Sequence, residues 1–225
     1  RWSVTFFNQV CGYTVETNTK LTGLNPVAGH TAGRRLWAGA ATNDQGLGTN
    51  DPFTLELVDK AVELAKVCDN KERTNRINGA PKYVMYIHPY QETSLRISAG
   101  SRWYDIQRAA LSGNGSSSNP IYTNALGEYH GVILRSSQDV TLGVDSSTGA
   151  AVANTRRAVL LGAQAACAAF GAKSGESKYR WNEELLDHKR KLEVSATSIM
   201  GLKKTQFNSV DFGVVTVSTY AAPSA

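Results

Sequence analysis

A strand that runs directly into a helix, over residues 83–96 (YVMYIHPYQETSLR), constrains the fold of this chain more than any other stretch. The run 83–87 has the apolar and aromatic composition of a buried strand. Pro89 suits the first position of a helix, because proline lacks the N–H that would be unpaired there, and the helix is expected to continue through Leu95. A buried strand joined to a helix in a chain of 225 residues predicts a mixed α+β fold with a sizeable core.

Three polar side chains in this stretch, those of His88, Tyr90 and Arg96, admit two interpretations. As a cluster after a strand, they could form the active site of a hydrolase or transferase. Alternatively, His88 caps the helix, because its imidazole can accept a hydrogen bond from a free N–H of the first turn. Arg96 would then lie exposed at the helix end and pair with a neighbouring acid. We favour the structural interpretation, since no partner for catalysis is evident.

The motifs of common enzyme classes are missing from the sequence. It contains no G-x-x-x-x-G-K-[ST] phosphate loop, no complete G-x-G-x-x-G and no G-x-S-x-G nucleophile elbow. The four histidines lie dozens of residues apart, and none has a partner at the spacing that zinc ligands require; they are His30, His88, His130 and His188. We therefore expect no catalytic residues, no metal site, no bound cofactor and no enzyme activity.

The clearest helix is expected over residues 53–68, where apolar residues recur at three- and four-residue steps. Asn50 or Asp51 is expected to cap it and Pro52 to lie in its first turn, with Glu56 and Lys60 paired on its outer face. Five other segments have expected structures: the last turns of a longer helix at 2–7, a helix at 102–111, a strand at 131–137, and long polar loops at 12–50 and 138–155. The chain is thus expected to begin inside a helix that started upstream.

The secondary-structure signals in the last third of the chain are less distinct. Residues 156–172 are apolar all round, which predicts a segment buried on most sides, either extended or helical at its start. The charged stretch around Glu183, Glu184 and His188 is expected to be the solvated face of a helix. Two alternating runs, 193–207 and 211–221, are expected to pair as an antiparallel hairpin, with Asn208 and Ser209 between them.

Charge and cysteine content limit the partners and the compartment. The net charge is +5, but the basic residues are scattered, so sequence-specific nucleic-acid binding is poorly supported and a non-specific nucleic-acid-binding module remains an alternative. The apolar runs are too short to cross a membrane. The three cysteines are Cys11, Cys68 and Cys167; the last two lie in apolar helical patterns, which predicts buried free thiols and a reducing compartment.

A series of motifs in fixed order resembles the major capsid proteins of tailed bacteriophages, specifically the family typified by the podophage N-four. The series runs from Phe6 to Tyr220: FFNQV, FTLELVDKAVELAK, YVMYIHPYQETSLR, RWYDIQRAAL, NPIYTNALGEYHGVIL, RRAVLLGAQAACAAFG, WNEELLDHKRKLEVSA, GLKKTQFN and DFGVVTVSTYA. Any one of these motifs is weak evidence, but their order across nearly the whole chain is specific.

This resemblance implies the Hong Kong 97-like capsid fold, with an axial domain, a peripheral domain that contains a spine helix and a β-hinge, an N-terminal arm and an extended loop. The arm, the extended loop and most of the spine helix would precede the first motif and are expected to be missing from this chain. Residues 1–52 would then hold the end of the spine helix and an irregular segment, residues 53–180 mainly the axial domain, and residues 181–225 the peripheral β-hinge strands.

The resemblance also implies a function. The chain would be a major capsid protein that self-assembles into hexamers and pentamers, which form the icosahedral shell around the double-stranded DNA of a tailed phage. Its partners would be copies of itself, the packaged DNA through non-specific contacts, and portal, scaffolding and decoration proteins. It would be assembled in the cytoplasm of the host bacterium and end in the virion.

Overall fold

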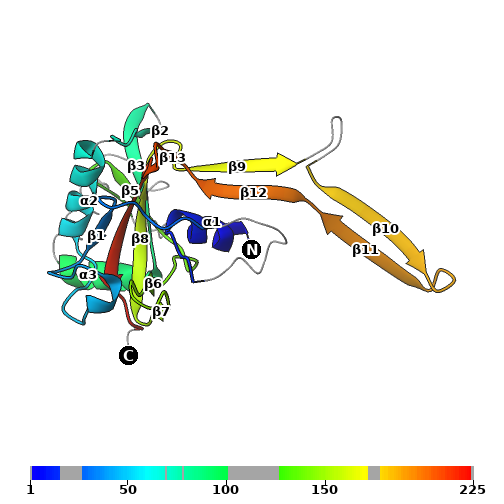
Figure 1. Ribbon diagram of the computed structural model, residues 1–225, viewed down its shortest axis with the longest axis horizontal. Coiled ribbons are helices and arrows are strands. Elements are labelled where there is room, and N and C mark those ends of the chain that lie inside the picture. Colours follow the sequence, from blue (N-terminus) through cyan, green and yellow to red (C-terminus); the bar gives the residue numbers. More distant parts are fainter. Residues whose placement is uncertain are drawn as a thin grey trace, which may run out of the picture.

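A seven-stranded mixed sheet, here called the main sheet, forms the body of the molecule (Figure 1). The computed structural model describes residues 2–15, 27–68, 70–77, 79–100, 127–171 and 178–223. The strands follow the order β1-β15-β8-β3-β5-β4, with β2 paired to β3. Their bounds are Arg35–Trp37 for β1, Asn75–Ile77 for β2, Ala80–Ile87 for β3, Glu128–Tyr129 for β4, Val132–Ser136 for β5, Thr155–Leu161 for β8 and Val214–Tyr220 for β15. Two pairings, β1 with β15 and β3 with β5, are parallel.

Helices cover both faces of the main sheet. Helices α2 (Leu55–Val67) and α3 (Pro89–Ala99) lie on one face, and α1 (Trp2–Val10) lies on the other (Figure 1). Successive side chains of a strand point to opposite faces, so Met85 packs in the core under α2 while Tyr86 packs on the side of α1. Both α1 and the predicted α+β character are thus confirmed, as are the strand before His88, the helix after it and the strand that became β5.

Helix α2 begins later than its sequence signals indicate. Its N-cap is Thr54, not Asn50 or Asp51. The Asp51 backbone instead accepts a hydrogen bond from Tyr220 N at 3.0 Å, and its carboxylate accepts one from Gly48 N. Because Thr54 is itself extended, with φ −128° and ψ 163°, Pro52 precedes the helix. The predicted Glu56–Lys60 pair is present, with 2.7 Å between the charged atoms.

Residues 156–172 do not form one buried segment, which corrects the prediction. They contain the buried strand β8 and then β9 (Ala166–Gly171), which is mostly exposed. The chain turns between the two strands, with Gln164 at a φ of 62°. An ideal Cβ on Gly162 would lie 2.7 Å from Arg73 O, so a larger side chain there would clash with backbone. The apolar pattern reflected two consecutive strands in different environments.

The charged stretch is a hairpin and not a helix. Strands β10 (Arg180–Leu186) and β11 (Lys191–Thr197) pair antiparallel. Three consecutive residues with positive φ, namely Asp187, His188 and Lys189, make the turn that a helix could not contain.

The two alternating runs near the C-terminus do not pair with each other along their length. Only the short strands β13 (Gln206–Phe207) and β14 (Val210–Asp211) form a hairpin, around the predicted turn at Asn208 and Ser209. Strand β15 pairs instead with β8 and β1, and β12 (Ile199–Lys204) pairs with β9. The loop predicted at 138–155 holds a small hairpin, β6 (Gly143–Val144) with β7 (Ala151–Val152), and residues 12–50 include β1 and the 3-10 helix η1 (Asp44–Gly46). The predicted helix at 102–111 lies outside the described residues.

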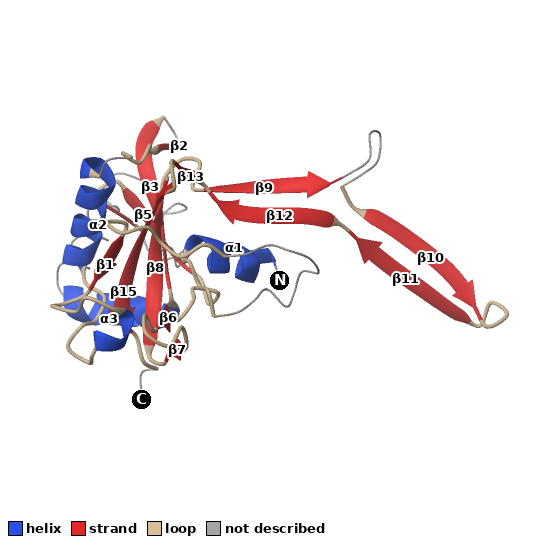
Figure 2. Cartoon of the chain, viewed as in Figure 1, coloured by secondary structure: helices blue, strands red, loops and turns tan. Residues whose placement is uncertain are grey.

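Strands β9, β12, β10 and β11 project from the body as two successive two-stranded ribbons, here called the hairpin extension (Figures 1 and 2). Helix α1 lies beside its first ribbon, where the Trp2 ring stacks on that of Phe170 at 5.5 Å between centroids. No helix in the described residues has the length and apolar character needed to span a membrane.

Candidate functional site

His88 is a helix cap. Its Nδ1 accepts a hydrogen bond from Tyr90 N at 3.2 Å, and its own N–H donates to Gln91 Oε1 at 2.9 Å. Burial, with a smaller contribution from the nearby Arg156, lowers the pKa of His88 to about 4, so the ring is neutral at pH 7. The structural interpretation from the sequence is therefore confirmed for this residue.

Tyr90 and Arg96 do not join His88 in a reactive cluster. The Tyr90 ring packs edge-on against His88, and the Arg156 guanidinium lies 5.9 Å from its centroid. Arg96 points to Glu92 one turn earlier, at 2.6 Å, with its side chain about half exposed. The described contacts of these residues thus support packing and surface pairing.

Metal-ligating and thiol groups are dispersed. Among the described residues no three His, Cys, Asp or Glu side chains are grouped to hold a metal ion. The cysteines are free, and burial raises the pKa of Cys11 to about 11. Cys68 is only half-buried and Cys167 is exposed, which corrects the prediction that both are buried, because Cys167 lies on the exposed strand β9.

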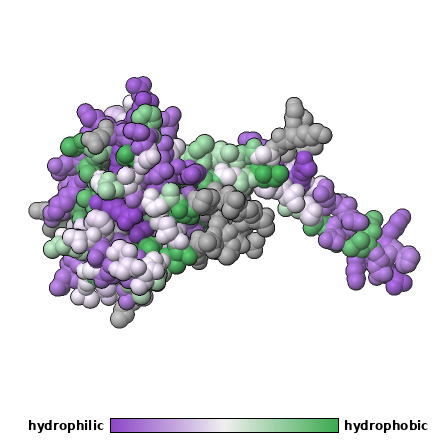
Figure 3. All heavy atoms as spheres, viewed as in Figure 1, coloured by the Kyte–Doolittle hydropathy of each residue, from purple (hydrophilic) through white to green (hydrophobic). Residues whose placement is uncertain are grey.

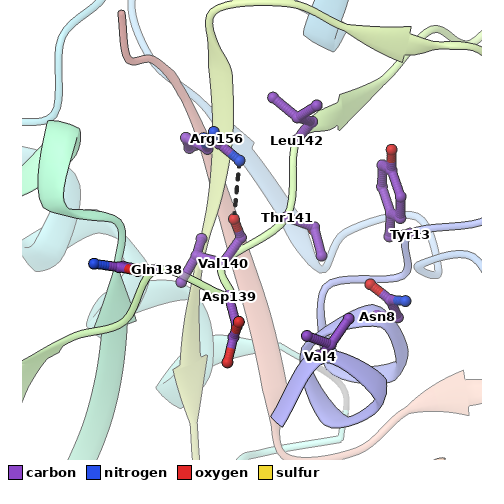
Figure 4. Close-up of a pocket in the computed structure, with 9 residues that line it drawn as sticks. All are labelled: Val4, Asn8, Tyr13, Gln138, Asp139, Val140, Thr141, Leu142 and Arg156. Carbon is purple, nitrogen blue, oxygen red and sulfur yellow. Dashed lines mark hydrogen bonds between the residues drawn. The ribbon is translucent and has the colours of Figure 1, made fainter. Parts of the chain in front are cut away.

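A groove of about 230 Å³ lies between α1 and residues 138–142 (Figure 4). Asn8 and Tyr13 line one side, and Asp139 and Arg156 line the other. The Arg156 guanidinium donates to Val140 O at 3.2 Å, the bond drawn dashed in Figure 4. With one acid and one base, each from a different segment, the groove carries no set of groups that indicates a reaction.

The outer ribbon of the hairpin extension has one apolar face. Residues directly opposite each other in an antiparallel pair point to the same side, and this places three pairs together: Trp181 with Ala196, Glu183 with Val194, and Leu185 with Leu192. Trp181 is 63% exposed, Leu192 62% and Leu185 57%. Five of these residues, Trp181, Leu185, Leu192, Val194 and Ala196, are here called the apolar face.

The other face of the same ribbon is mostly polar. It carries the pairs Arg180 with Thr197, Asn182 with Ser195, Glu184 with Glu193 and Leu186 with Lys191. Figure 3 shows the resulting hydrophobic patch within the otherwise hydrophilic outer part of the extension. A surface hydrophobic on one side and polar on the other is typical of a sheet that packs against something.

The apolar face has no cover within the described part of the chain. A two-stranded hairpin alone is at best marginally stable in water, and contiguous exposed apolar residues on a folded protein mark interaction sites. The apolar face is therefore the candidate functional site, and its chemistry is that of a protein–protein contact.

These residues were missed in the sequence, although a signal was present. Trp181, Glu183 and Leu185 alternate with Asn182 and Glu184, which is the period of a strand. The many charges in the same stretch also suit a solvated helix, and the prediction of a helix rested on those charges.

Comparisons with known proteins agree on one class. A family described as "Phage capsid protein" matches residues 1–223. The capsid protein of Ralstonia phage GP4 is similar in structure, with a TM-score of 0.77 and 31% sequence identity, over 99% of this chain and 64% of that chain. The cyanophage Pam1 capsid asymmetric unit gives a TM-score of 0.70 at 18% identity, over 98% of this chain and 64% of that one.

A third structure, the head of Helicobacter pylori bacteriophage KHP40, gives a TM-score of 0.52 at 15% identity. The match covers 80% of this chain and 62% of that chain. The two matches below 20% identity support the fold alone. No curated protein matches the chain. The chain spans just under two thirds of the length of the phage proteins that it matches.

Proposed function

The chain belongs to the phage capsid protein family, and from that premise we propose that it is a major capsid protein whose copies self-assemble into the hexamers and pentamers of an icosahedral shell. The observation that carries this proposal is the uncovered apolar face on a hairpin extension that projects beyond the body. A second copy of the chain is the partner that fits it, because the solved structures that it resembles are those of phage capsids.

The physical basis is the burial of exposed apolar area. A leucine side chain that passes from exposed to fully buried contributes about 1.5–3 kcal/mol. Two leucines and a tryptophan on one face thus supply several kcal/mol per contact, which is modest for a pair but sufficient when each subunit contacts several neighbours and the shell closes.

The two-domain division of the capsid fold is also a proposal for this chain. A boundary at residue 181 would assign β15 to the peripheral part, yet β15 pairs with β8 in the main sheet. We therefore propose that the main sheet with α2 and α3 is the axial part, and that α1 with the hairpin extension is the peripheral part. The contact between Trp2 and Phe170 supports the second grouping.

The shell would enclose double-stranded DNA. With a net charge of +5, each subunit reduces the repulsion between the packed phosphates without reading sequence. Portal, scaffolding and decoration proteins are proposed as further partners, with assembly in the host cytoplasm and a final location in the virion.

The proposal is tested with a double substitution, Leu185→Ser with Leu192→Ser, in the full-length protein. Loss of two buried leucines weakens each contact by roughly 3 kcal/mol, which raises the concentration needed for assembly by about a hundredfold. Electron microscopy and size-exclusion chromatography count the shells. Because both side chains are exposed in the subunit, its circular dichroism and melting temperature stay unchanged.

The matched control exchanges a pair on the opposite face, Asn182→Ser with Ser195→Asn, at directly opposed positions of the same strands. The control assembles like the wild type. Normal shells from the leucine double variant would remove the apolar face from the mechanism, and a wild type that never forms shells with scaffold supplied would overturn the function.

A further inference from the structure

Three buried charged or titratable side chains meet at the root of the hairpin extension. Lys204 Nζ lies 2.9 Å from Asp211 Oδ1 and 3.0 Å from Oδ2, and His30 Nδ1 lies 3.1 Å from the same Oδ2. All three side chains have no exposed area. Lys204 is the last residue of β12, and Asp211 is the last residue of β14, so this cluster lies where the extension returns to the body.

The cluster ties the extension to a segment from the other end of the chain. Thr31 N donates to Asp211 Oδ2 at 3.0 Å, and Asp211 N donates to Thr31 Oγ1 at 3.1 Å. Lys204 Nζ also donates to Gly29 O at 2.7 Å. The segment that holds residues 29–31 is thereby bonded to both strands at the root.

A second buried network, formed by Arg157, lies beside this cluster and binds the chain just after α1. Arg157 on β8 donates to the carbonyl oxygens of Cys11 and Gly12, just past the end of α1, at 3.1 and 3.0 Å, and pairs with Asp44 at 2.6 Å. Gly12 has a φ of +59° and lies against the His30 ring: an ideal Cβ there would be 2.8 Å from Cδ2 and 3.0 Å from Nε2. His30 therefore lies where α1, the main sheet and the extension meet.

The bonding of His30 suits only its neutral form. With Nδ1–H donating to Asp211, Nε2 is left buried without a hydrogen-bond partner among the described residues, and it lies beside Gly12. A proton on Nε2 would find no acceptor in the described part of the chain, and it would add a charge beside the cations Lys204 and Arg157.

We propose that His30, Lys204 and Asp211 form an acid-sensitive latch, which holds the hairpin extension and α1 at a fixed angle on the main sheet and opens when His30 takes up a proton. The latch is a property of the single subunit and is independent of the proposed function. If the chain builds shells, the latch sets the direction in which the apolar face meets a neighbouring copy.

The groups that face His30 determine the sign of the effect. Burial lowers the pKa of His30 to about 4; the hydrogen bond to Asp211 opposes this, while the charges of Lys204 and Arg157 add to it. Arg35 on β1 acts on Asp211 and Lys204 and so adds positive charge to the same site. Although burial alone would raise the pKa of Asp211, its hydrogen bonds lower it overall, so Asp211 stays ionised throughout the relevant range.

The size of the effect follows from linkage. In the open state the imidazole is solvated and regains its ordinary pKa of about 6.5, so the open state gains protons first as the pH falls. The latch is therefore fully engaged above about pH 6.5 and is weakened progressively as the pH falls toward 4. Between pH 7.5 and 5.0 the open-to-closed ratio rises by about 30-fold.

Amide hydrogen exchange of the unassembled full-length subunit at pH 7.5 and 5.0 tests the latch, with rates corrected for the intrinsic effect of pH. The amides at the root, those of Thr31, Thr205, Asp211 and Phe212, are expected to lose protection about 30-fold at pH 5.0, while those in β3 and β8 are unchanged. Equal protection at the two pH values in the wild type overturns the proposal without any variant.

Two variants assign the effect to His30. In His30→Gln the side chain is neutral at both pH values and its amide can still donate to Asp211, so the pH-dependent step disappears. In His130→Gln, where an exposed histidine lies 3.3 Å from Asp59, the step remains. A step of wild-type size in His30→Gln, or its loss in His130→Gln, would contradict the assignment. If His30→Gln does not fold, Lys204→Met decides. Removal of the neighbouring cation brings the pKa of the latched His30 closer to its ordinary value, so the change in protection between pH 7.5 and 5.0 becomes smaller, and a change of wild-type size rejects the latch.

Discussion

At the scale of single residues, buried polar groups of this chain hold backbone in place. His88 closes the first turn of α3, and Gln91, its partner in the capping box, donates to Thr219 Oγ1 at 2.8 Å. The cap thus connects α3 to β15 as well as starting a helix. The hydrogen-bond partners of His88 both belong to the helix cap, so the catalytic interpretation of this histidine has no support from its contacts.

Substitution of the cap has a defined cost. We expect His88→Ala to lower the free energy of unfolding by about 0.5–2 kcal/mol, because Tyr90 N loses its acceptor. Urea denaturation measures the difference. The control Arg96→Ala removes an exposed pair and should cost at most about 0.5 kcal/mol. Equal losses in the two variants would show that the cap contributes nothing special.

The cap could be predicted from the sequence and the latch could not, because the partners in the cap are close along the chain and those in the latch are far apart. His88, Pro89 and Gln91 are near neighbours, so their sequence alone implies their contact. His30 and Asp211 are 181 positions apart, and the isolated histidine in a loop offered no indication of its partner. Long-range polar contacts of this kind become visible only when the strands have been paired.

At the scale of elements, the local geometry of the turns distinguishes a hairpin from a helix where the charge pattern is compatible with both. The stretch around Glu183 has both helical and alternating features, and its positive-φ turn at residues 187–189 selects the hairpin. The same holds at Asn208 and Ser209, with φ values of 50° and 62°, which the sequence correctly marked as a turn. What remained open there was which strands the turn would join.

The two-residue turn between β13 and β14 predicts a stabilising substitution. Hairpin turns with two positive φ values favour Asn-Gly, so Ser209→Gly removes a left-handed penalty at this position. We expect a gain of about 0.5 kcal/mol in thermal unfolding, since the greater freedom of glycine in the unfolded chain offsets part of the relief. The same change at Ser136, an exposed strand residue of β5, should instead cost about 0.5–1 kcal/mol. A loss of stability in Ser209→Gly would contradict the turn assignment.

At the scale of the whole molecule, a packed body carries a projection without a core of its own. The body buries two clusters, one on each face of the main sheet, whereas every residue of β10 and β11 is exposed. A monomer gains no stability from such a projection, because its apolar side chains stay exposed. A protein that binds copies of itself can bury them in the contact. The projection is therefore the part whose environment should change most on assembly.

Limited proteolysis can detect that change. In the free subunit, trypsin should cut early at the tip of the extension, after Lys189, Arg190 or Lys191, because the tip is exposed and held by few contacts. In assembled shells the same cuts should be slower by a factor of about ten or more, as local opening is suppressed. Mass spectrometry of the fragments that end at these residues gives the rates. Equal rates in the two forms would place the tip away from every interface.

The local elements follow from the amino-acid sequence alone: the strand into α3, the body of α2, the cap at His88, the turn at Asn208, and a motif series whose order indicates the family. Each depends on residues within a few positions of one another, where backbone sterics and periodic burial act directly. Four features become visible only in the three-dimensional fold: the pairing of β15 with β8, the exposure of β9, the apolar face and the latch. The strand pairing and the latch arise from contacts between distant segments, and no short window of sequence contains both partners. The exposure of β9 and of the apolar face follows from the direction in which the extension leaves the body, which no local pattern encodes.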